Sequence, residues 1–301
     1  MRIDWIDKKI QLRDTCKRWL NRNQTGVLFA GSGLKSAVVI PCVGEDYAKE
    51  GELASHHARK ALPDEVEVRL VTNLPREAFG NLQSGVVHDC IKLPASDRSH
   101  YRQLWQSRMV KISAPLRSTA DLVLMIDSDL MLLQCPVIEL ESRALCGVFR
   151  SGRAFSRIKE LKKRCGLPGL SDRNYRMKHM NSGFLAASRE TWKILVPYWV
   201  GAYQKYWDVV DCKGWPPTDQ VALNTAIDSS GILETSLSIW HNWPVSKHWN
   251  DDMSQIPKNV IGAHGGFPLS EWERRILDPN SSLAFQTQAN TRISRYEDKN
   301  A

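Results

Sequence analysis

The chain has 301 residues, of which 42% are hydrophobic and 25% charged, an ordinary composition for a globular protein that can bury a substantial core. Its 41 basic and 33 acidic residues give a formal net charge of +8, which is compatible with nucleic acid, a membrane surface or an anionic substrate as partner. No run approaches the roughly 18 apolar residues of a membrane span, and the first residues lack the apolar core of a signal peptide, so we expect a cytoplasmic protein.

The first expected element is an amphipathic helix over residues 3–20, within an N-terminal segment that ends near residue 30. Ile3, Ile6, Ile10 and Trp19 lie near one helical face, and the lysines lie elsewhere. Such a helix usually packs on the protein's own core. A position on an anionic membrane surface is the alternative.

A strand–helix–strand pattern follows. Residues 36–41 and 66–72 are rich in valine, isoleucine and leucine and predict two core strands, and residues 47–62 between them predict a helix. A second helical pattern covers residues 99–118. This alternation indicates a doubly wound α/β arrangement.

The next expected strand, Leu122–Ile126, is a run of five apolar residues that continues into Asp127-Ser128-Asp129. A run without polar alternation is typical of a strand buried on both faces. Ligands bind at the carboxyl ends of strands in open α/β sheets. Two acids separated by one residue at such an end form a plausible clamp for a divalent cation.

Positive charge is concentrated between the acidic pair and the next motif. Residues 150–178 contain ten lysines and arginines against two acids, Glu160 and Asp172. Such a segment is either a solvated face or a binding surface for an anionic partner.

Glycines and prolines divide the second half into short expected elements, and eight of the 11 tryptophans lie between Trp192 and Trp272. Their rings could either cover the flat faces of a sugar or fill a tryptophan-rich core. Residues 279–301 form a polar tail expected to be weakly ordered. The seven cysteines are scattered without a Cys-x-x-Cys pair, so neither a zinc site nor a disulfide framework is expected.

Three further segments carry candidate site residues. Residues 179–186 place Asn181-Ser182-Gly183 at the head of an apolar strand, which is followed by a helix starting near Arg189. In residues 217–224, Thr218 is a suitable N-cap for a helix with Asp219 in its first turn. Residues 260–267 predict a short strand that ends in His264, with Gly265 and Gly266 behind it.

In order and spacing, these four motifs over about residues 36–270 resemble the GT-A glycosyltransferases, in particular the retaining glycogenin-like and lipopolysaccharide galactosyltransferase-like groups. The resemblance implies a single Rossmann-like α/β domain over residues 31–278, with a mixed central sheet flanked by helices. Its donor half would cover about residues 31–135 and its acceptor half about residues 136–278.

The resemblance also implies a metal site and a donor site. Asp127, Asp129 and His264 would hold Mn²⁺ or Mg²⁺ at the diphosphate of a nucleotide sugar, beside Ser128, Gly265 and Gly266. The family's glycine three positions after this histidine is Phe267 here. Asn181, Asp219 and Gln220 would contact the donor sugar near the reacting carbon. The nucleotide or its phosphates would meet Arg108, Lys111 and the loop formed by Pro41, Cys42, Val43 and Gly44.

The function implied is transfer of a hexose from a UDP- or GDP-sugar to a hydroxyl of a glycan or lipid-linked acceptor, with retention of anomeric configuration. An anionic acceptor, or peripheral contact with a membrane surface, would suit the basic segment. A haloacid-dehalogenase-type phosphatase and a non-catalytic carbohydrate-binding module are the alternatives. Nucleic acid is not expected, because no groove-reading helix or RNA-binding signature accompanies the charge.

Overall fold

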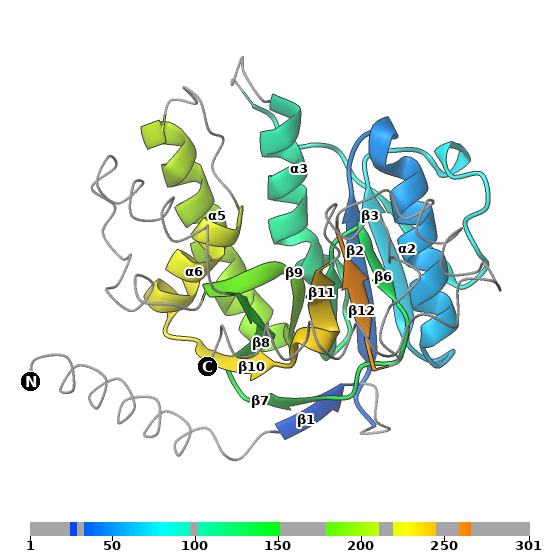
Figure 1. Ribbon diagram of the computed structural model, residues 1–301. Coiled ribbons are helices and arrows are strands. Elements are labelled where there is room, and N and C mark those ends of the chain that lie inside the picture. Colours follow the sequence, from blue (N-terminus) through cyan, green and yellow to red (C-terminus); the bar gives the residue numbers. More distant parts are fainter. Residues whose placement is uncertain are drawn as a thin grey trace, which may run out of the picture.

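The computed structural model describes residues 25–28, 33–96, 102–150, 179–210, 219–244 and 259–265, with the backbone alone for residues 25–28, 150 and 208–210. In these ranges the chain forms a central β-sheet with helices on both faces and two smaller sheets beside it (Figure 1). This is the α/β arrangement with flanking helices that the alternating sequence pattern predicts.

The elements follow one another along the chain as strands, helices and short 3₁₀ turns. The strands are β1 (Thr25–Leu28), β2 (Ser36–Cys42), β3 (Glu67–Thr72), β4 (Val86–Cys90), β5 (Leu122–Ile126), β6 (Leu130–Leu132), β7 (Ile138–Glu141), β8 (Ala144–Arg150), β9 (His179–Ser188), β10 (Leu233–Leu237), β11 (Trp243–Pro244) and β12 (Gly262–His264). The α-helices are α2 (Ala48–Ala61), α3 (Arg102–Ser113), α5 (Arg189–Val210) and α6 (Asp219–Ser230), and the 3₁₀ turns are η1 (Glu45–Tyr47), η2 (Arg76–Ala78), η3 (Ala114–Arg117) and η4 (Ile239–Asn242).

The central sheet has seven strands in the order β10-β8-β9-β5-β2-β3-β4. Strands β5, β2, β3 and β4 are parallel, whereas β9 lies antiparallel between β5 and β8. The sheet is therefore mixed, as predicted. Because β9 is antiparallel to β5, its first residues lie at the carboxyl end of β5, where Phe184 is opposite Ile126.

Both faces of the sheet are covered, which explains the uninterrupted apolar strands. Along β2, Val38 and Ile40 pack in the cluster that contains α2, whereas Ala37 and Val39 pack in the cluster that contains α3, α5 and α6. All five residues of β5 are buried in the same alternating way. Burial on both faces leaves polar side chains only beyond the strand ends, and there the acidic pair begins.

Three tryptophans of the second half lie within this core. Trp192, Trp199 and Trp207 on α5 are at most 1% exposed. The indole N–H of Trp192 donates to the carbonyl of Val123 in the sheet. These three rings therefore fill the core and present no face to a sugar.

A three-stranded sheet of order β11-β12-β6 brings a late segment back to the acidic pair. Strand β12 is antiparallel to β6, with His264 opposite Leu130. Since Leu130 directly follows Asp129, this pairing places His264 beside the acids, although more than 130 residues separate them in the sequence. A further two-stranded sheet joins β1 and β7.

The observed elements confirm the predicted strands at residues 36–41, 66–72 and 122–126 and the helices at residues 47–62 and 99–118, with small shifts at their ends. The expectation of short elements in the second half is wrong for α5, which has 22 residues. The predictions for residues 3–20, for the tail 279–301 and for the basic residues 151–178 lie outside the described ranges. None of the helices in the described ranges combines the length and the apolar character that a bilayer crossing requires.

Candidate functional site

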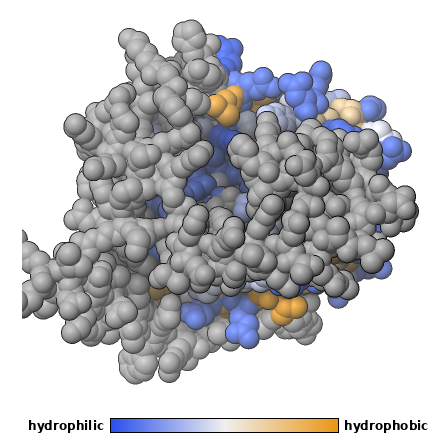
Figure 2. Space-filling model, viewed as in Figure 1, coloured by the Kyte–Doolittle hydropathy of each residue, from blue (hydrophilic) through white to orange (hydrophobic). Residues whose placement is uncertain are grey.

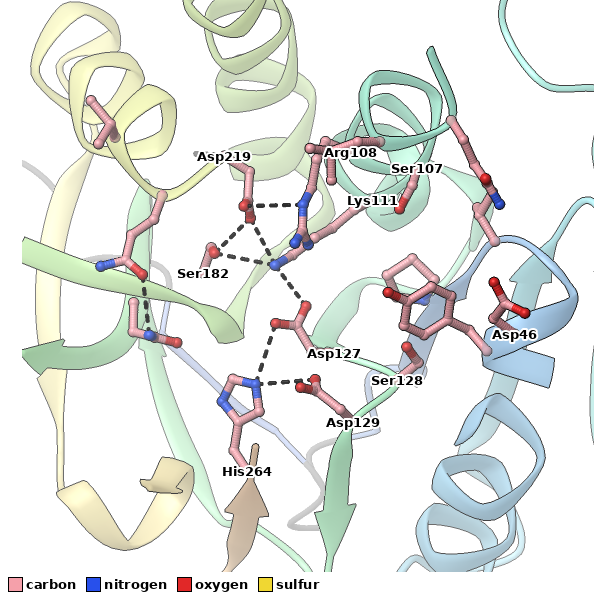
Figure 3. A pocket seen from close by; sticks show the side chains of 18 residues that line it. Asp46, Ser107, Arg108, Lys111, Asp127, Ser128, Asp129, Ser182, Asp219 and His264 are labelled. Carbon is pink, nitrogen blue, oxygen red and sulfur yellow. Dashed lines mark hydrogen bonds and ion pairs between the residues drawn. The ribbon is translucent and has the colours of Figure 1, made fainter. Parts of the chain in front are cut away.

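Two acids and a histidine meet where β5 ends and β12 ends. Nε2 of His264 lies 3.1 Å from Oδ1 of Asp129 and 3.5 Å from Oδ2 of Asp127. One ligand atom from each residue lies within 4.8 Å of the others (Figure 3). Two carboxylates and an imidazole at this spacing are a donor set suited to Mn²⁺ or Mg²⁺, so the residues fit the cation that the sequence predicts.

The histidine ring rests on the backbone of β9. A Cβ added to Gly183 would lie 2.9 Å from Nδ1 of His264 and closer still to Cε1. Only glycine leaves room for the ring in this position. The Nδ1 atom is 2.7 Å from Oδ1 of Asn242, a fully buried residue of η4.

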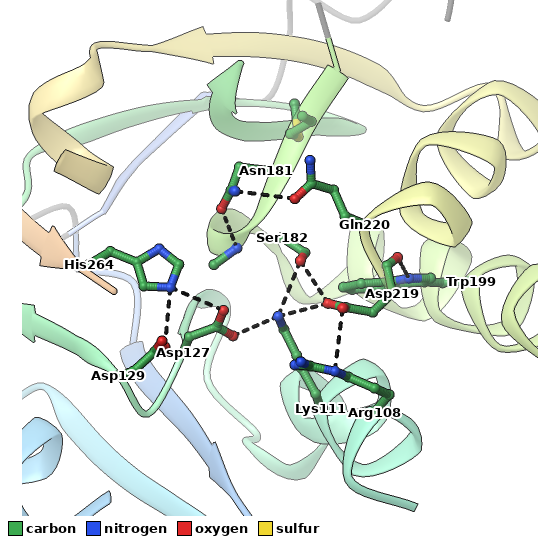
Figure 4. Close-up of polar contacts among 12 residues, drawn as sticks. Arg108, Lys111, Asp127, Asp129, Asn181, Ser182, Trp199, Asp219, Gln220 and His264 are labelled. Atoms are coloured by element: carbon green, nitrogen blue, oxygen red, sulfur yellow. Dashed lines mark hydrogen bonds and ion pairs between the residues drawn. The ribbon is translucent and has the colours of Figure 1, made fainter. Parts of the chain in front are cut away.

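A buried lysine connects the acidic pair to a third acid. Nζ of Lys111, at the end of α3, lies 2.7 Å from Oδ1 of Asp127 and 2.7 Å from Oδ2 of Asp219. It also donates to Oγ of Ser182, which in turn donates to Oδ2 of Asp219 (Figure 4). The Lys111 side chain is 5% exposed, so its charge is held almost entirely by these groups.

Charge neighbours govern the ionisation of this cluster. Burial by itself raises the pKa of Asp219, but the positive charges of Lys111 and Arg108 outweigh it and hold that pKa below its usual range. Burial lowers the pKa of Lys111, and the charges of Asp127 and Asp219 more than reverse the effect. Both members of the Lys111–Asp219 pair are therefore charged at neutral pH.

Two further residues have shifted ionisation. The charge of Asp219 raises the pKa of Arg108, whose Nε lies 3.5 Å from an oxygen of that acid. For Asp129, burial raises the pKa, but the contact with His264 and nearby positive charge bring it to about 2. A carboxylate held ionised is the form that binds a cation.

Two amide side chains form the wall near the start of α6. Nδ2 of Asn181 donates to Oε1 of Gln220 over 3.2 Å, and Oδ1 of Asn181 accepts from the N–H of Gly183. Trp199 donates its indole N–H to the carbonyl of Asp219 and so anchors the first turn of α6. Asn181 and Gln220 therefore lie side by side at the pocket.

These groups surround a pocket of about 620 Å³ (Figure 3). Its lining includes most of the residues singled out from the sequence: Pro41, Val43, Arg108, Lys111, Asp127, Ser128, Asp129, Asn181, Asp219, Gln220 and His264. In the space-filling view, hydrophilic side chains are visible in a hollow near the middle of the face (Figure 2). The pocket opens where β2 and β5 end, the edge at which α/β sheets bind ligands.

Some predicted residues do not line the pocket. The thiol of Cys42 is 1% exposed and donates to the carbonyl of Tyr47, so its side chain points into the core. Gly44, with φ of 93°, shapes the loop, and its N–H donates to Asn73. Gly265 lies close to Asp129, because an added Cβ would be 3.9 Å from Oδ2 of that residue. Gly266 and Thr218 lie outside the described residues.

The structure adds pocket residues that the sequence did not single out. Asp46 and Tyr47 line the wall beyond β2, and Gln103 and Ser107 on α3 face them. The position of Asp46 and Tyr47, within a few residues of a strand end, was a usable signal. Asn242 lies in a tryptophan-rich stretch with no periodic pattern, and nothing in the sequence distinguishes it.

No protein-family model and no curated relative matches the chain. Solved structures, in contrast, match it. The apo structure of WbbM, a bifunctional glycosyltransferase, has a TM-score of 0.52 and 14% identity, over 85% of this chain and 52% of that one. This chain therefore spans about half the length of that protein.

This chain also matches two structures of the galactosyltransferase LgtC, over nearly the whole length of that protein. The complex with donor and acceptor sugar analogues has a TM-score of 0.49 and 14% identity, over 84% of this chain and 96% of that one. An active-site mutant has a TM-score of 0.49 and 13% identity, over 82% and 100%. With the mixed sheet and its flanking helices, the likeness to WbbM confirms the predicted fold, that of a glycosyltransferase structure.

Proposed function

We propose that this chain is a glycosyltransferase that takes a hexose from a nucleotide diphosphate sugar and transfers it to a hydroxyl group. One observation carries the proposal: a group suited to a divalent cation and a buried Lys111–Asp219 pair flank one pocket at the carboxyl edge of the sheet. A donor of this class presents a diphosphate and a sugar, and the pocket has separate walls for the two.

The cation would be held by Asp127, Asp129 and His264. When bound, it would neutralise the negative charge that develops on the departing diphosphate. The imidazole among the ligands favours Mn²⁺ over Mg²⁺. UDP- or GDP-sugars are the proposed donors.

Arg108 and Lys111 supply positive charge on the other side of Asp127. Arg108 is 36% exposed at its side chain and lines the pocket, so its guanidinium can meet a phosphate. Lys111 forms ion pairs with Asp127 and Asp219 and contributes mainly by holding both acids in place. Both cations would favour a leaving group that gains negative charge.

The sugar would lie against Asn181, Asp219 and Gln220. Asp219 already meets Lys111, Arg108 and Ser182, which makes it a poor base and a good positioning group for sugar hydroxyls. The amide oxygen of Gln220 is then the better candidate to stabilise positive charge at the reacting carbon. Since these groups offer no free general base, retention of configuration is proposed.

The two alternatives have less support. A phosphatase of the haloacid-dehalogenase type needs its Asp-x-Asp strand to open the domain, whereas β2 and β3 precede β5 here. A carbohydrate-binding module would use exposed aromatic rings, and the three tryptophans of α5 are buried. Neither alternative accounts for Lys111 between two acids in a pocket.

A thermal-shift screen of UDP-, GDP- and CDP-sugars with and without Mn²⁺ tests the donor class. A cognate donor raises the unfolding temperature by mass action, and more so with Mn²⁺ present. A positive result is followed by a transfer and hydrolysis assay. No stabilisation by any nucleotide sugar, with intact Mn²⁺ binding, would count against the proposal.

Asp129→Asn tests the metal group and Asp64→Asn is its matched control, because Asp64 is exposed and lies outside the pocket. Turnover should fall at least about 100-fold for Asp129→Asn, since a charge-bearing ligand is lost. The control should keep wild-type turnover. Normal turnover of Asp129→Asn in Mn²⁺ would show that the metal group is assigned wrongly.

Retention and the acceptor need separate tests. Proton NMR of the first-formed product reports the anomeric configuration directly, and an inverted product would refute retention. An anionic glycan or lipid-linked acceptor bound by residues 150–178 is proposed from the charge of that segment. Sedimentation with neutral and anionic vesicles tests the membrane version, which predicts binding to the anionic vesicles alone.

A further inference from the structure

Asn242 does not line the pocket, yet it contacts residues on both sides of it. Its Oδ1 lies 2.7 Å from Nδ1 of His264, and its Nδ2 lies 2.7 Å from Oδ1 of Asn181. The residue is fully buried. It reaches the pocket through these two neighbours.

The direction of each hydrogen bond follows from a backbone donor. The N–H of Gly183 can only donate, so the Asn181 atom 2.8 Å away is an oxygen. The Asn242 atom facing that oxygen must then be the amide nitrogen, and the other Asn242 atom is an oxygen. That oxygen can only accept, which leaves Nδ1 of His264 as the donor.

We propose that Asn242 is a positioning residue that keeps the proton of the neutral His264 ring on Nδ1 and so leaves the lone pair of Nε2 free for the cation that Asp127 and Asp129 would hold. Nε2 is the atom that lies 3.1 Å from Asp129, and a ring nitrogen binds a cation only through an unprotonated lone pair. The inference deepens the proposed function, because it rests on the same metal group. A buried acceptor behind a histidine ligand fixes ring orientation as well as tautomer.

The same amide links the metal group to the sugar wall. From His264 the hydrogen bonds continue through Asn242 and Asn181 to Gln220 and so connect four side chains. Rotation of Asn242 would break contacts at both ends. Asn242 therefore sets the position of Asn181 as well as the tautomer of His264.

Two substitutions separate these roles. Asn242→Leu removes the acceptor for Nδ1 and the donor to Asn181, whereas Asn242→Asp keeps the acceptor and replaces the donor by a second carboxylate oxygen. Nitrogen-15 NMR of the full chain with saturating Mg²⁺ reports the tautomer of His264. Its resonances are those absent from a His264→Gln spectrum, and Mn²⁺ affinity is measured by the electron paramagnetic resonance of free Mn²⁺.

In the wild type and in Asn242→Asp, the proton should lie on Nδ1, with Mn²⁺ affinities within a few-fold of each other. Asn242→Leu should give a mixture of tautomers and bind Mn²⁺ about 10- to 100-fold more weakly. Thr225→Val is the control. It removes a buried hydroxyl that hydrogen-bonds to Tyr206, outside the pocket lining, and should leave tautomer and affinity unchanged.

A wild-type ring protonated on Nε2 would overturn the inference, and this measurement holds even if Asn242→Leu does not fold. Loss of Mn²⁺ affinity in Asn242→Asp as large as in Asn242→Leu would overturn it as well. Neither readout involves a nucleotide sugar or turnover. The inference can therefore fail while hexose transfer is confirmed, and it can hold where no donor is found.

Discussion

The amine of Lys111 lies 2.7 Å from a carboxylate oxygen of Asp219, with side chains 5% and 8% exposed. Removing one partner of such a buried pair leaves an uncompensated charge, which commonly costs about 3–5 kcal/mol. Lys111→Met should therefore lower the free energy of unfolding by about 3 kcal/mol, measured by urea denaturation.

A matched control is Lys193→Met, because Lys193 pairs with Glu190 at the surface, where the side chains are 48% and 75% exposed. That change should alter stability by less than about 1 kcal/mol. Asp219→Asn added to Lys111→Met should recover part of the lost stability. If both lysine substitutions lowered the free energy of unfolding by the same amount, burial of the Lys111 pair would contribute nothing to stability.

The lowered pKa of Asp219 predicts a pH dependence of stability. An aspartate in the unfolded chain has a pKa of about 3.9, and positive charge holds the folded value below it. The stabilisation is therefore complete well above the unfolded pKa and is lost as pH falls toward the folded pKa. The difference in unfolding free energy between the wild type and Asp219→Asn should be constant from about pH 7 to about pH 5 and should shrink between about pH 4.5 and about pH 2.5. A difference that stays constant over the lower of these ranges, in urea titrations at each pH, would contradict the assignment.

Gly183→Ala should damage the metal group through the ring of His264. The added Cβ would collide with the imidazole and push it from Asp129, so Mn²⁺ affinity should fall at least about tenfold. Gly201→Ala is the control, because nothing lies within 4 Å of its added Cβ. Gly201 is in the interior of α5, where alanine should stabilise the helix by about 0.5–1 kcal/mol. Unchanged Mn²⁺ titrations for Gly183→Ala would place His264 outside the metal group.

Thiol labelling should distinguish buried from exposed cysteines. Burial raises the pKa of Cys42 and of Cys146 to about 12, so neither forms the reactive thiolate at mildly alkaline pH. Iodoacetamide should modify the exposed Cys90 in the folded protein and reach Cys42 and Cys146 only in urea. Peptide mapping by mass spectrometry identifies each modified residue. Labelling of Cys42 in the folded state would mean that β2 and η1 are not packed as described.

The strands that carry the acids, and many of the residue types in the site, can be predicted from local sequence pattern. Apolar runs such as Leu122–Ile126 report burial on both faces, and this constraint acts locally, one residue at a time. Strand ends in α/β sheets bind ligands, so Asp127 and Asp129 could be assigned without knowing their neighbours. The tryptophan-rich stretch could not be divided between core and surface, because hydrophobicity alone does not say which side of a helix meets the sheet.

Which side chains contact one another depends on the packing of distant segments. His264 faces Asp129 because β12 pairs with β6, and Lys111 joins Asp127 to Asp219 because α3 ends beside β9 and α6. Asn242 could not be found from sequence, because its role depends on two hydrogen bonds to residues 22 and 61 positions away. Hydrophobic periodicity indicates which side of each element is buried and which is exposed to solvent. Contacts between distant segments arise instead from strand pairing and from the packing of the whole chain.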